Sequence, residues 1–291
     1  MGTSLVPPGW IQDQLPAGLE SKWFESSLGR LHYMSRGTGQ KVVLLHGNPT
    51  WSFLWRKVIA ELDPKTFHCI APDLLNLGLS DSLSAKDFNM RNHVQAMADF
   101  FKHVDLDGAI LVIQDWGGPI GLNALIQSNQ SIKGLVVLNT GVSAPKHPFK
   151  ISKFHSFVQG KIIPKLLFNI FRYPMYSLHG VQANKDSIRG KVAKAYRYPM
   201  KLKSQWTSAL RFAKMVPSSE AHPSYKRFVE NESFCQDFTK PVEVVWGVKD
   251  PILGRGLKTV KSVFPHGQFQ EVNAGHFLQE ECPTDIANAI L

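Results

Sequence analysis

The sequence predicts an α/β fold in which a mostly parallel sheet is flanked by helices and carries a helical insertion. Short apolar runs rich in β-branched residues have the length of buried parallel strands. The first four lie at 41–45, 67–71, 109–113 and 134–138. Segments long enough for helices follow the runs, at 52–62, 87–104 and 119–129. Alternation of this kind indicates a sheet covered by helices on both faces.

The remaining elements complete this pattern. Residues 23–36 have the composition of two strands around a glycine turn. From 144 to 227 no buried-strand run occurs, and prolines divide the segment into short helical pieces. Strand-like runs return at 241–246 and 268–272. We therefore expect a core domain with an inserted helical cap, the core at 1–143 and 228–291 and the cap at 144–227.

Length and composition are those of a globular protein with a large core. The 291 residues are 43% hydrophobic and 19% charged, which excludes a disordered chain. No apolar run has the length of a transmembrane segment, and the first ten residues carry no signal-peptide pattern. The three cysteines are widely spaced and form no metal-binding pattern with histidines. We therefore expect reduced thiols and a cytoplasmic protein.

Charge is distributed very unevenly along the chain. The segment 145–227 contains 17 basic and two acidic residues, a net charge of +15, whereas the remainder has 16 basic and 21 acidic residues, a net charge of −5. Such a basic segment fits either an anionic partner or a solvated face. Because no nucleic-acid-binding motif accompanies it, we expect no nucleic-acid partner.

An aspartate stands where the run at 109–113 meets the next helix. Asp115 lies within Gln114 to Gly118, in the strand–turn–helix context of a nucleophile elbow. The first glycine of the usual elbow is replaced by Ile113, and its serine by Asp115. The turn is expected to expose this side chain at the carboxyl edge of the sheet, where ligands of open α/β sheets bind. An aspartate here also fits a helix N-cap.

Three further polar residues follow predicted strands. Asn48 comes after the run at 41–45, before a proline whose peptide bond is able to be cis. Asp250 follows the run at 241–246, and His276 follows the run at 268–272. The chain order is then nucleophile, acid and base, and the carboxyl ends of parallel strands bring these side chains together.

On these residues the sequence resembles the haloalkane dehalogenases of the α/β-hydrolase superfamily. The resemblance extends from about Trp23 to the last residue and is weakest in the insertion. It therefore implies the α/β-hydrolase fold. The stretches that carry it are His46 to Ser52, Ala71 to Asp73, Gly78 to Asp81, Gln114 to Gly118, Asp250-Pro251 and Gly275 to Phe277.

The resemblance implies a reaction in two steps. Asp115 displaces halide from a saturated carbon and forms an alkyl-enzyme ester, a displacement for which a carboxylate is well suited. His276 then acts as general base on the water that hydrolyses this ester, and Asp250 orients the imidazole. The substrate is a small halogenated hydrocarbon, and the products are a primary alcohol, halide and a proton. The reaction requires water and implies no metal or organic cofactor.

The resemblance also implies donors for the developing charges. The backbone N–H groups of Asn48 and Trp116 form the oxyanion hole, and their side-chain N–H groups bind the halide. Asn139 stands where one branch of the family has its glutamate acid, so Asp250 takes that role, as in the branch with Asn and Trp halide donors. Trp206, the cap tryptophan, is the alternative second donor. Possible pocket residues are Trp206, Phe154, Phe157 and Phe168.

The main alternative is an epoxide hydrolase with the same Asp–His–Asp machinery. It requires tyrosines in the cap to protonate the epoxide oxygen, and Asn48 argues against it because that reaction needs no halide donor. A fluoroacetate-type dehalogenase, a coelenterazine-type luciferase and a binding module without activity resemble the sequence less. Oligomeric state, the preferred haloalkane and any partner of the basic cap remain open. The candidate cap tyrosines are Tyr173, Tyr176, Tyr196, Tyr198 and Tyr225.

Overall fold

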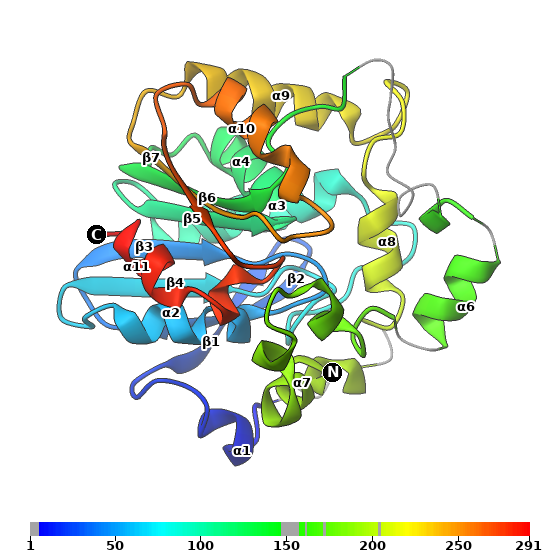
Figure 1. Cartoon of the computed structure of the whole chain (residues 1–291), viewed down its shortest axis with the longest axis horizontal. Helices are drawn as coiled ribbons and strands as arrows, with labels where there is room; N and C mark the ends of the chain where they lie inside the picture. Colours follow the sequence, from blue (N-terminus) through cyan, green and yellow to red (C-terminus); the bar gives the residue numbers. More distant parts are fainter. Residues whose placement is uncertain (1–5, 147–156, 161, 171–172, 203–204) are drawn as a thin grey trace.

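The computed structural model describes residues 6–146, 157–160, 162–170, 173–202 and 205–291 (Figure 1). Its sheet has eight strands in the order β1-β2-β4-β3-β5-β6-β7-β8. The pairs β1·β2 and β2·β4 are antiparallel and the other neighbours are parallel. The strands are β1 (Glu20–Ser26), β2 (Gly29–Arg36), β3 (Gln40–Leu45), β4 (Phe67–Pro72), β5 (Ile110–Asp115), β6 (Gly134–Thr140), β7 (Val242–Gly247) and β8 (Gln268–Val272).

The predicted fold class is confirmed, and each predicted parallel strand agrees with the structure to within about two residues at either end. The inner strands β3, β5 and β6 could be predicted because they are almost fully buried and consist largely of continuous apolar runs. In β3, for example, Val42 to Leu45 are all fully buried. The edge strand β8 is mostly exposed and has a mixed sequence.

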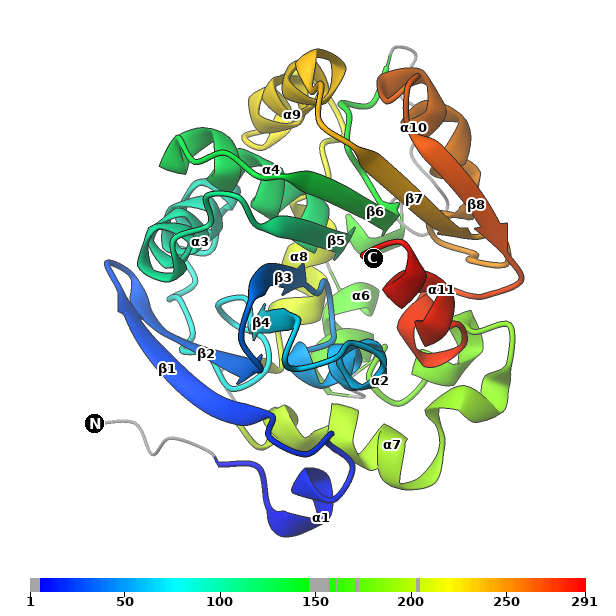
Figure 2. The same ribbon diagram turned by 90° about the vertical axis from the view of Figure 1, so that its left-hand side faces the viewer.

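Helices cover both faces of the sheet (Figure 2). One hydrophobic cluster joins the sheet to α3, α4, α9 and α10, and a second joins its other face to α2 and α11. Helix α3 begins where the Asn89 side chain accepts the N–H of Asn92 and ends at Asp105, whose backbone is left-handed. The helices are α3 (Met90–Val104), α4 (Gly117–Ser128), α9 (Tyr225–Asp237), α10 (Leu257–Val263), η1 (Ser52–Trp55), α2 (Arg56–Glu61) and α11 (Pro283–Asn288), with α1 (Gly9–Gln12), η6 (Gly254–Gly256) and η7 (Leu278–Glu280) as short additions.

Short helices fill the insertion between β6 and β7. In Figure 1 they lie together on one side of the sheet. Helix α8 covers the loop after β3, since the Asn48 amide donates to the Ala209 carbonyl. None of the helices in the described ranges is long and apolar enough to span a membrane. The helices of the insertion are α6 (Ile163–Asn169), η2 (Leu178–Val181), η3 (Lys185–Ile188), α7 (Gly190–Tyr196), η4 (Tyr198–Lys201) and α8 (Ser208–Lys214).

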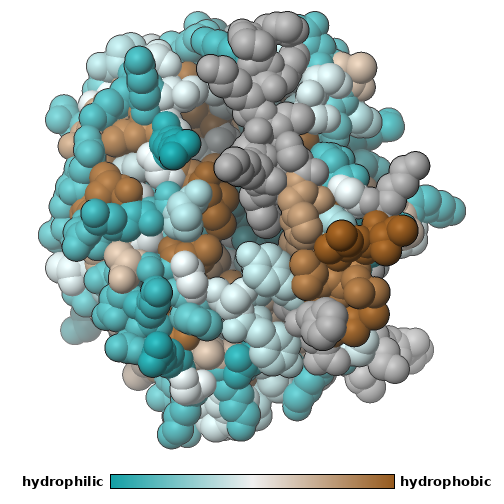
Figure 3. Space-filling view, turned by 45° about the vertical axis from the view of Figure 1, so that its right-hand side comes forward, coloured by the Kyte–Doolittle hydropathy of each residue, from teal (hydrophilic) through white to brown (hydrophobic). Residues whose placement is uncertain are grey.

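The outer surface of the insertion combines charge with exposed apolar side chains. Figure 3 shows a hydrophobic patch on this face, next to polar surface. Helix α6 and its flanks expose Ile162, Ile163, Leu166 and Ile170, each by about half or more. The basic character expected of this segment is therefore interrupted by an aliphatic strip.

A buried ion pair within the core accepts a hydrogen bond from the insertion. Glu280 accepts two hydrogen bonds from the Arg56 guanidinium at 2.5 and 2.9 Å and one from the Tyr196 hydroxyl at 2.6 Å. Burial opposes ionisation of Glu280, but the Arg56 charge outweighs it and holds the pKa of this carboxyl below its usual range. The network therefore links η7, which begins two residues after His276, to α2 and to α7 of the insertion.

We expect Glu280→Gln to lower the free energy of unfolding by about 3–5 kcal/mol, because the Arg56 charge would stay buried without a counter-charge. Glu271→Gln is the matched control, since its ion pair with Lys261 is about half exposed and such pairs contribute about 1 kcal/mol or less. Urea unfolding of both variants measures the difference. Equal, small losses would show that the buried pair does not hold the network together.

Candidate active site

The polypeptide turns sharply between β5 and α4, and Asp115 stands at the turn. Its φ is 46°, in the left-handed region that residues other than glycine seldom adopt. The Thr140 hydroxyl donates to the Asp115 carbonyl at 2.5 Å and supports this conformation from β6. The structure thus places Asp115 in the geometry of a nucleophile elbow, as the motif predicts.

The Asp115 carboxylate is largely buried and lies against backbone donors. About 14% of its side chain is exposed, and Oδ1 accepts the Asn48 N–H at 2.6 Å. Burial raises the pKa of Asp115, whereas His276 and the N–H groups of Trp116 and Asn48 lower it in part. Both predicted oxyanion-hole N–H groups therefore meet the carboxylate.

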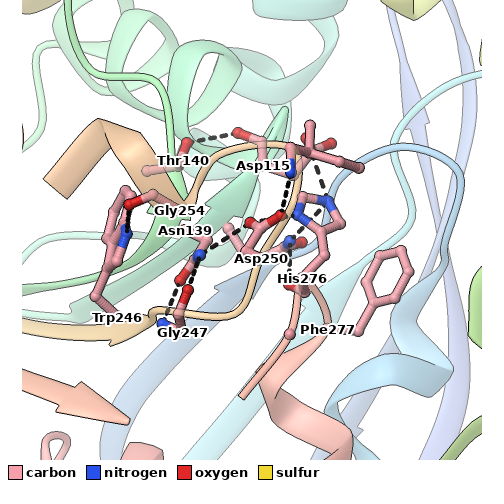
Figure 4. A network of polar contacts seen from close by, with 12 residues as sticks. Asp115, Asn139, Thr140, Trp246, Gly247, Asp250, Gly254, His276 and Phe277 are labelled. Atoms are coloured by element: carbon pink, nitrogen blue, oxygen red, sulfur yellow. Dashed lines mark hydrogen bonds and ion pairs between the residues drawn. The ribbon is translucent and has the colours of Figure 1, made fainter. Parts of the chain in front are cut away.

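His276 connects the two aspartates (Figure 4). Its Nδ1 lies 2.8 Å from Asp250 Oδ2, and its Nε2 lies 3.7 Å from Asp115 Oδ2. Burial lowers the pKa of His276, but the charges of Asp250 and Asp115 outweigh burial and raise it above the ordinary value. The three residues predicted as nucleophile, base and acid thus lie in one continuous chain of contacts.

Asp250 is held by β6 and by its own turn. The Asn139 amide on β6 donates to Asp250 Oδ2 at 2.9 Å and to the Gly247 carbonyl at 3.0 Å. The Ile252 N–H donates to Asp250 Oδ1 at 2.7 Å. Asn139 therefore orients the carboxylate from the neighbouring strand β6.

Gln114 is a site residue that the sequence reasoning left without a role. Its side chain is fully buried, and its amide N–H donates to the His276 carbonyl at 3.2 Å. The same nitrogen lies 3.5 Å from His276 Nε2, and its oxygen has no hydrogen-bond partner among the described residues. Its place next to Asp115 in the elbow motif is the signal that would have identified it.

The two expected halide donors have different surroundings. Trp116 is 6% exposed, and its ring packs against Phe212 and Phe228 at centroid distances of 5.7 and 6.1 Å. Asn48 donates one amide hydrogen bond to the Ala209 carbonyl at 3.2 Å. The peptide bond after Asn48 is cis.

The expected lining residues from the insertion have varied surroundings. The Trp206 indole N–H donates to the Met200 carbonyl at 2.7 Å, so this group is engaged within the insertion rather than turned to a halide. Phe168 packs in a small cluster with α8, and Phe157 is 38% exposed. Phe154 lies outside the described residues. The aromatic ring that α8 brings to Trp116 is Phe212, which the sequence did not distinguish from its neighbours.

A small cavity of about 10 Å³ lies beside the Asn48 loop, with Pro49, Trp51 and Ala209 in its wall. It has room for about one water molecule. Within the described ranges no group of three potential ligands is arranged to hold a metal ion.

Comparisons with known proteins match this fold. Residues 41–283 match the family model of the alpha/beta hydrolase fold. Haloalkane dehalogenase 2 of Mycobacterium tuberculosis (strain ATCC 25618 / H37Rv) is 32% identical over 290 residues, which cover 94% of each chain. A cis-3-alkyl-4-alkyloxetan-2-one decarboxylase of Shewanella oneidensis is 28% identical over 90% of this chain and 84% of its own. The solved tetrameric haloalkane dehalogenase DpaA of Paraglaciecola agarilytica NO2 superposes with a TM-score of 0.80, at 25% identity, over 98% of this chain and 96% of its own.

The loop before Asn48 leaves no space for a side chain at Gly47. A Cβ there would lie 2.2 Å from Asp115 Oδ1 and 2.5 Å from the Trp116 nitrogen. We expect Gly47→Ala to cost about 1–3 kcal/mol of stability, because the Asp115 turn must shift. Gly180→Ala is the control, since its Cβ meets open space and we expect a change within about 0.5 kcal/mol. Thermal unfolding measures the stability of both variants. Equal losses of stability would contradict the close packing at Gly47.

The charge on Asp250 is expected to control the pKa of His276. In the native protein this pKa lies above the ordinary value of 6.5. The raised pKa means that protonated His276 stabilises the folded protein. This contribution to the free energy of folding is fully present below the pKa of His276 in the unfolded state and is lost as pH rises through its pKa in the folded state. Asp250→Asn should lower the pKa of His276. The substitution removes one of the two negative charges that raise this pKa, whereas the burial that lowers it remains.

An NMR pH titration of the His276 ring measures this effect. Asp186→Asn, an exposed change in the insertion, is the control and should leave the titration where it is. An unchanged titration in Asp250→Asn would show that Asp250 does not act through its charge.

Proposed function

The chain belongs to the α/β-hydrolase fold family as a haloalkane dehalogenase-like hydrolase, and we propose that it cleaves haloalkanes through an ester on Asp115. The observation that carries the proposal is the carboxylate at the elbow, with Oδ1 held by the Asn48 N–H and Oδ2 3.7 Å from His276 Nε2. Serine at this position attacks carbonyl carbon, whereas a carboxylate is suited to displacement at saturated carbon.

In the first step Asp115 Oδ2 attacks the carbon that bears the halogen. The new C–O bond forms as the carbon–halogen bond breaks, and halide leaves with the bonding electron pair. The attacking oxygen is Oδ2 because Oδ1 is occupied by the Asn48 N–H at 2.6 Å. His276 takes no part in this step, since no proton moves.

In the second step a water molecule hydrolyses the ester. His276 Nε2 takes a proton from the water as it adds to the ester carbonyl carbon, and Asp250 stabilises the imidazolium. Negative charge develops on Oδ1, which already lies in the hole formed by the backbone of Asn48 and Trp116. One such donor is worth about 2.7–4 kcal/mol. Collapse of this intermediate releases the alcohol and restores the carboxylate.

Halide binding is assigned to the side chains of Trp116 and Asn48. An asparagine amide has two N–H groups, and the bond to Ala209 uses one of them, so the other is available for an anion. Trp116 contributes its indole N–H from a nearly buried ring. This pair, with Asp250 as acid, supports the branch of the family that the sequence resembles.

Selection of the haloalkane is assigned to the proposed cap domain, 144–227. The alternative activity, epoxide hydrolysis, would need tyrosine hydroxyls from this cap to face Asp115. Tyr196 donates to Glu280 and Tyr198 to the Val6 carbonyl, so these two hydroxyls give the alternative no support.

The test is halide release from a panel of bromo- and iodoalkanes, with a terminal epoxide and a β-lactone alongside. We expect the native protein to release halide and Asp115→Ala to release none, because the nucleophile is absent. His276→Phe should release one halide per site and retain an alkyl group on Asp115, detectable by mass spectrometry of the peptide.

Thermal unfolding of each variant serves as the folding control. Opening of the epoxide without halide release would favour the hydrolase alternative, and turnover of the β-lactone alone would favour the chemistry of the decarboxylase relative. A folded protein that forms no ester and releases no halide would contradict the proposed function.

A further inference from the structure

The loop that carries His276 is hydrogen-bonded along its backbone to the proposed cap. The His276 N–H donates to the Val181 carbonyl at 2.9 Å. The Gln182 side chain accepts the Phe277 N–H at 2.9 Å and donates to the Phe277 carbonyl at 3.0 Å. One buried amide thus pairs with both backbone groups of the residue after the base.

The backbone at Gly275 lies so close to residues 181–182 that a side chain at Gly275 would not fit. A Cβ at Gly275 would lie 2.3 Å from the Val181 carbonyl oxygen and 2.5 Å from the Gln182 Cα. Glu281 joins the same segments, since its carboxylate accepts the N–H groups of Gly275 and Asn184. Gln182 is only 5% exposed, so water does not replace these bonds while the segments are together.

The two reacting side chains share a support from β5 but differ in their contact with the proposed cap. Asp115 is held by β5, the Asn48 loop and Thr140, whereas the hydrogen bonds of the Gln182 side chain within the described residues go to Ser187 and Phe277. The His276 ring is oriented by Asp250, and its carbonyl accepts the Gln114 amide on β5. Its backbone N–H is held by Val181 of the proposed cap, and the neighbouring Phe277 is held by Gln182.

We propose that Gln182 is a positioning residue for ester hydrolysis, which makes the second step, but not the first, depend on docking of the cap segment 181–184. The inference rests on the proposed function, because it assigns Gln182 to one of its two steps. Formation of the ester needs only the Asp115 carboxylate, whereas hydrolysis needs His276 Nε2 at hydrogen-bonding distance from a water. A displacement of a reacting group by about 1 Å lowers the rate by up to about 10²-fold.

The test is a single-turnover measurement on Gln182→Met, which keeps the side-chain length and removes both hydrogen bonds to Phe277. A bromoalkane is mixed with excess enzyme, the reaction is quenched, and the alkylated Asp115 peptide is followed by mass spectrometry. We expect ester formation within about twofold of the native rate, and hydrolysis slower by about 10–100-fold. The ester should accumulate, and halide should appear in a burst.

Two further variants make the result specific. Gln182→Glu keeps an acceptor for the Phe277 N–H and loses the donor, so we expect a smaller accumulation of ester. It also gives the same readout if Gln182→Met does not fold. Tyr198→Phe removes a cap hydrogen bond to the Val6 carbonyl, far from the His276 loop in the sequence, and should accumulate no ester.

The proposal is overturned if folded Gln182 variants slow both steps alike or hydrolyse the ester at the native rate. His276→Phe distinguishes this failure from that of the proposed function. If the Asp115 ester accumulates in His276→Phe but not in the Gln182 variants, only the proposed role of Gln182 is rejected. Absence of ester in His276→Phe rejects the dehalogenase mechanism, and this inference with it.

Discussion

The proposed reaction requires the Asp115 carboxylate to carry its charge in a site where about 14% of the side chain is exposed. Burial favours the neutral form, and a neutral carboxyl group is a poor nucleophile. The charged form is favoured by two backbone N–H groups and by His276, which face the carboxylate, whereas the charge of Asp250 opposes it. The turn at Asp115, the close approach of Gly47 and the hydrogen-bonded His276 together determine the surroundings of this buried charge.

The parallel sheet is what allows such a site to be assembled from distant parts of the chain. Asn48 follows β3, Asp115 ends β5, and Asp250 and His276 follow β7 and β8. Neighbouring parallel strands end at the same edge, so four loops meet without a large rearrangement of any one of them. Asn139 on β6 joins its neighbour β7 to the acid, and the sheet thereby sets the direction of the Asp250 carboxylate.

The sequence predicted the parts of the molecule that depend on local pattern. The buried strands are continuous apolar runs, and the site residues at their ends follow from strand order. The insertion could not be resolved in this way, because its side chains take their environment from segments far away in the chain. Phe168 and Phe212 look alike in the sequence, yet one packs within the cap cluster and the other against Trp116. Gln182 carries no motif, and only the fold reveals its pairing with Phe277.

The contact at Gly275 limits how the enzyme can be redesigned. Lengthening a connection between two neighbouring strands costs little entropy, about 0.6 kcal/mol per doubling, so helices between β6 and β7 are natural sites for grafting from relatives with other specificities. A graft that replaces everything between these strands would also remove the backbone that meets the histidine loop. Chimeras should therefore exchange α6 and α8 while retaining residues 178–184 from the host chain.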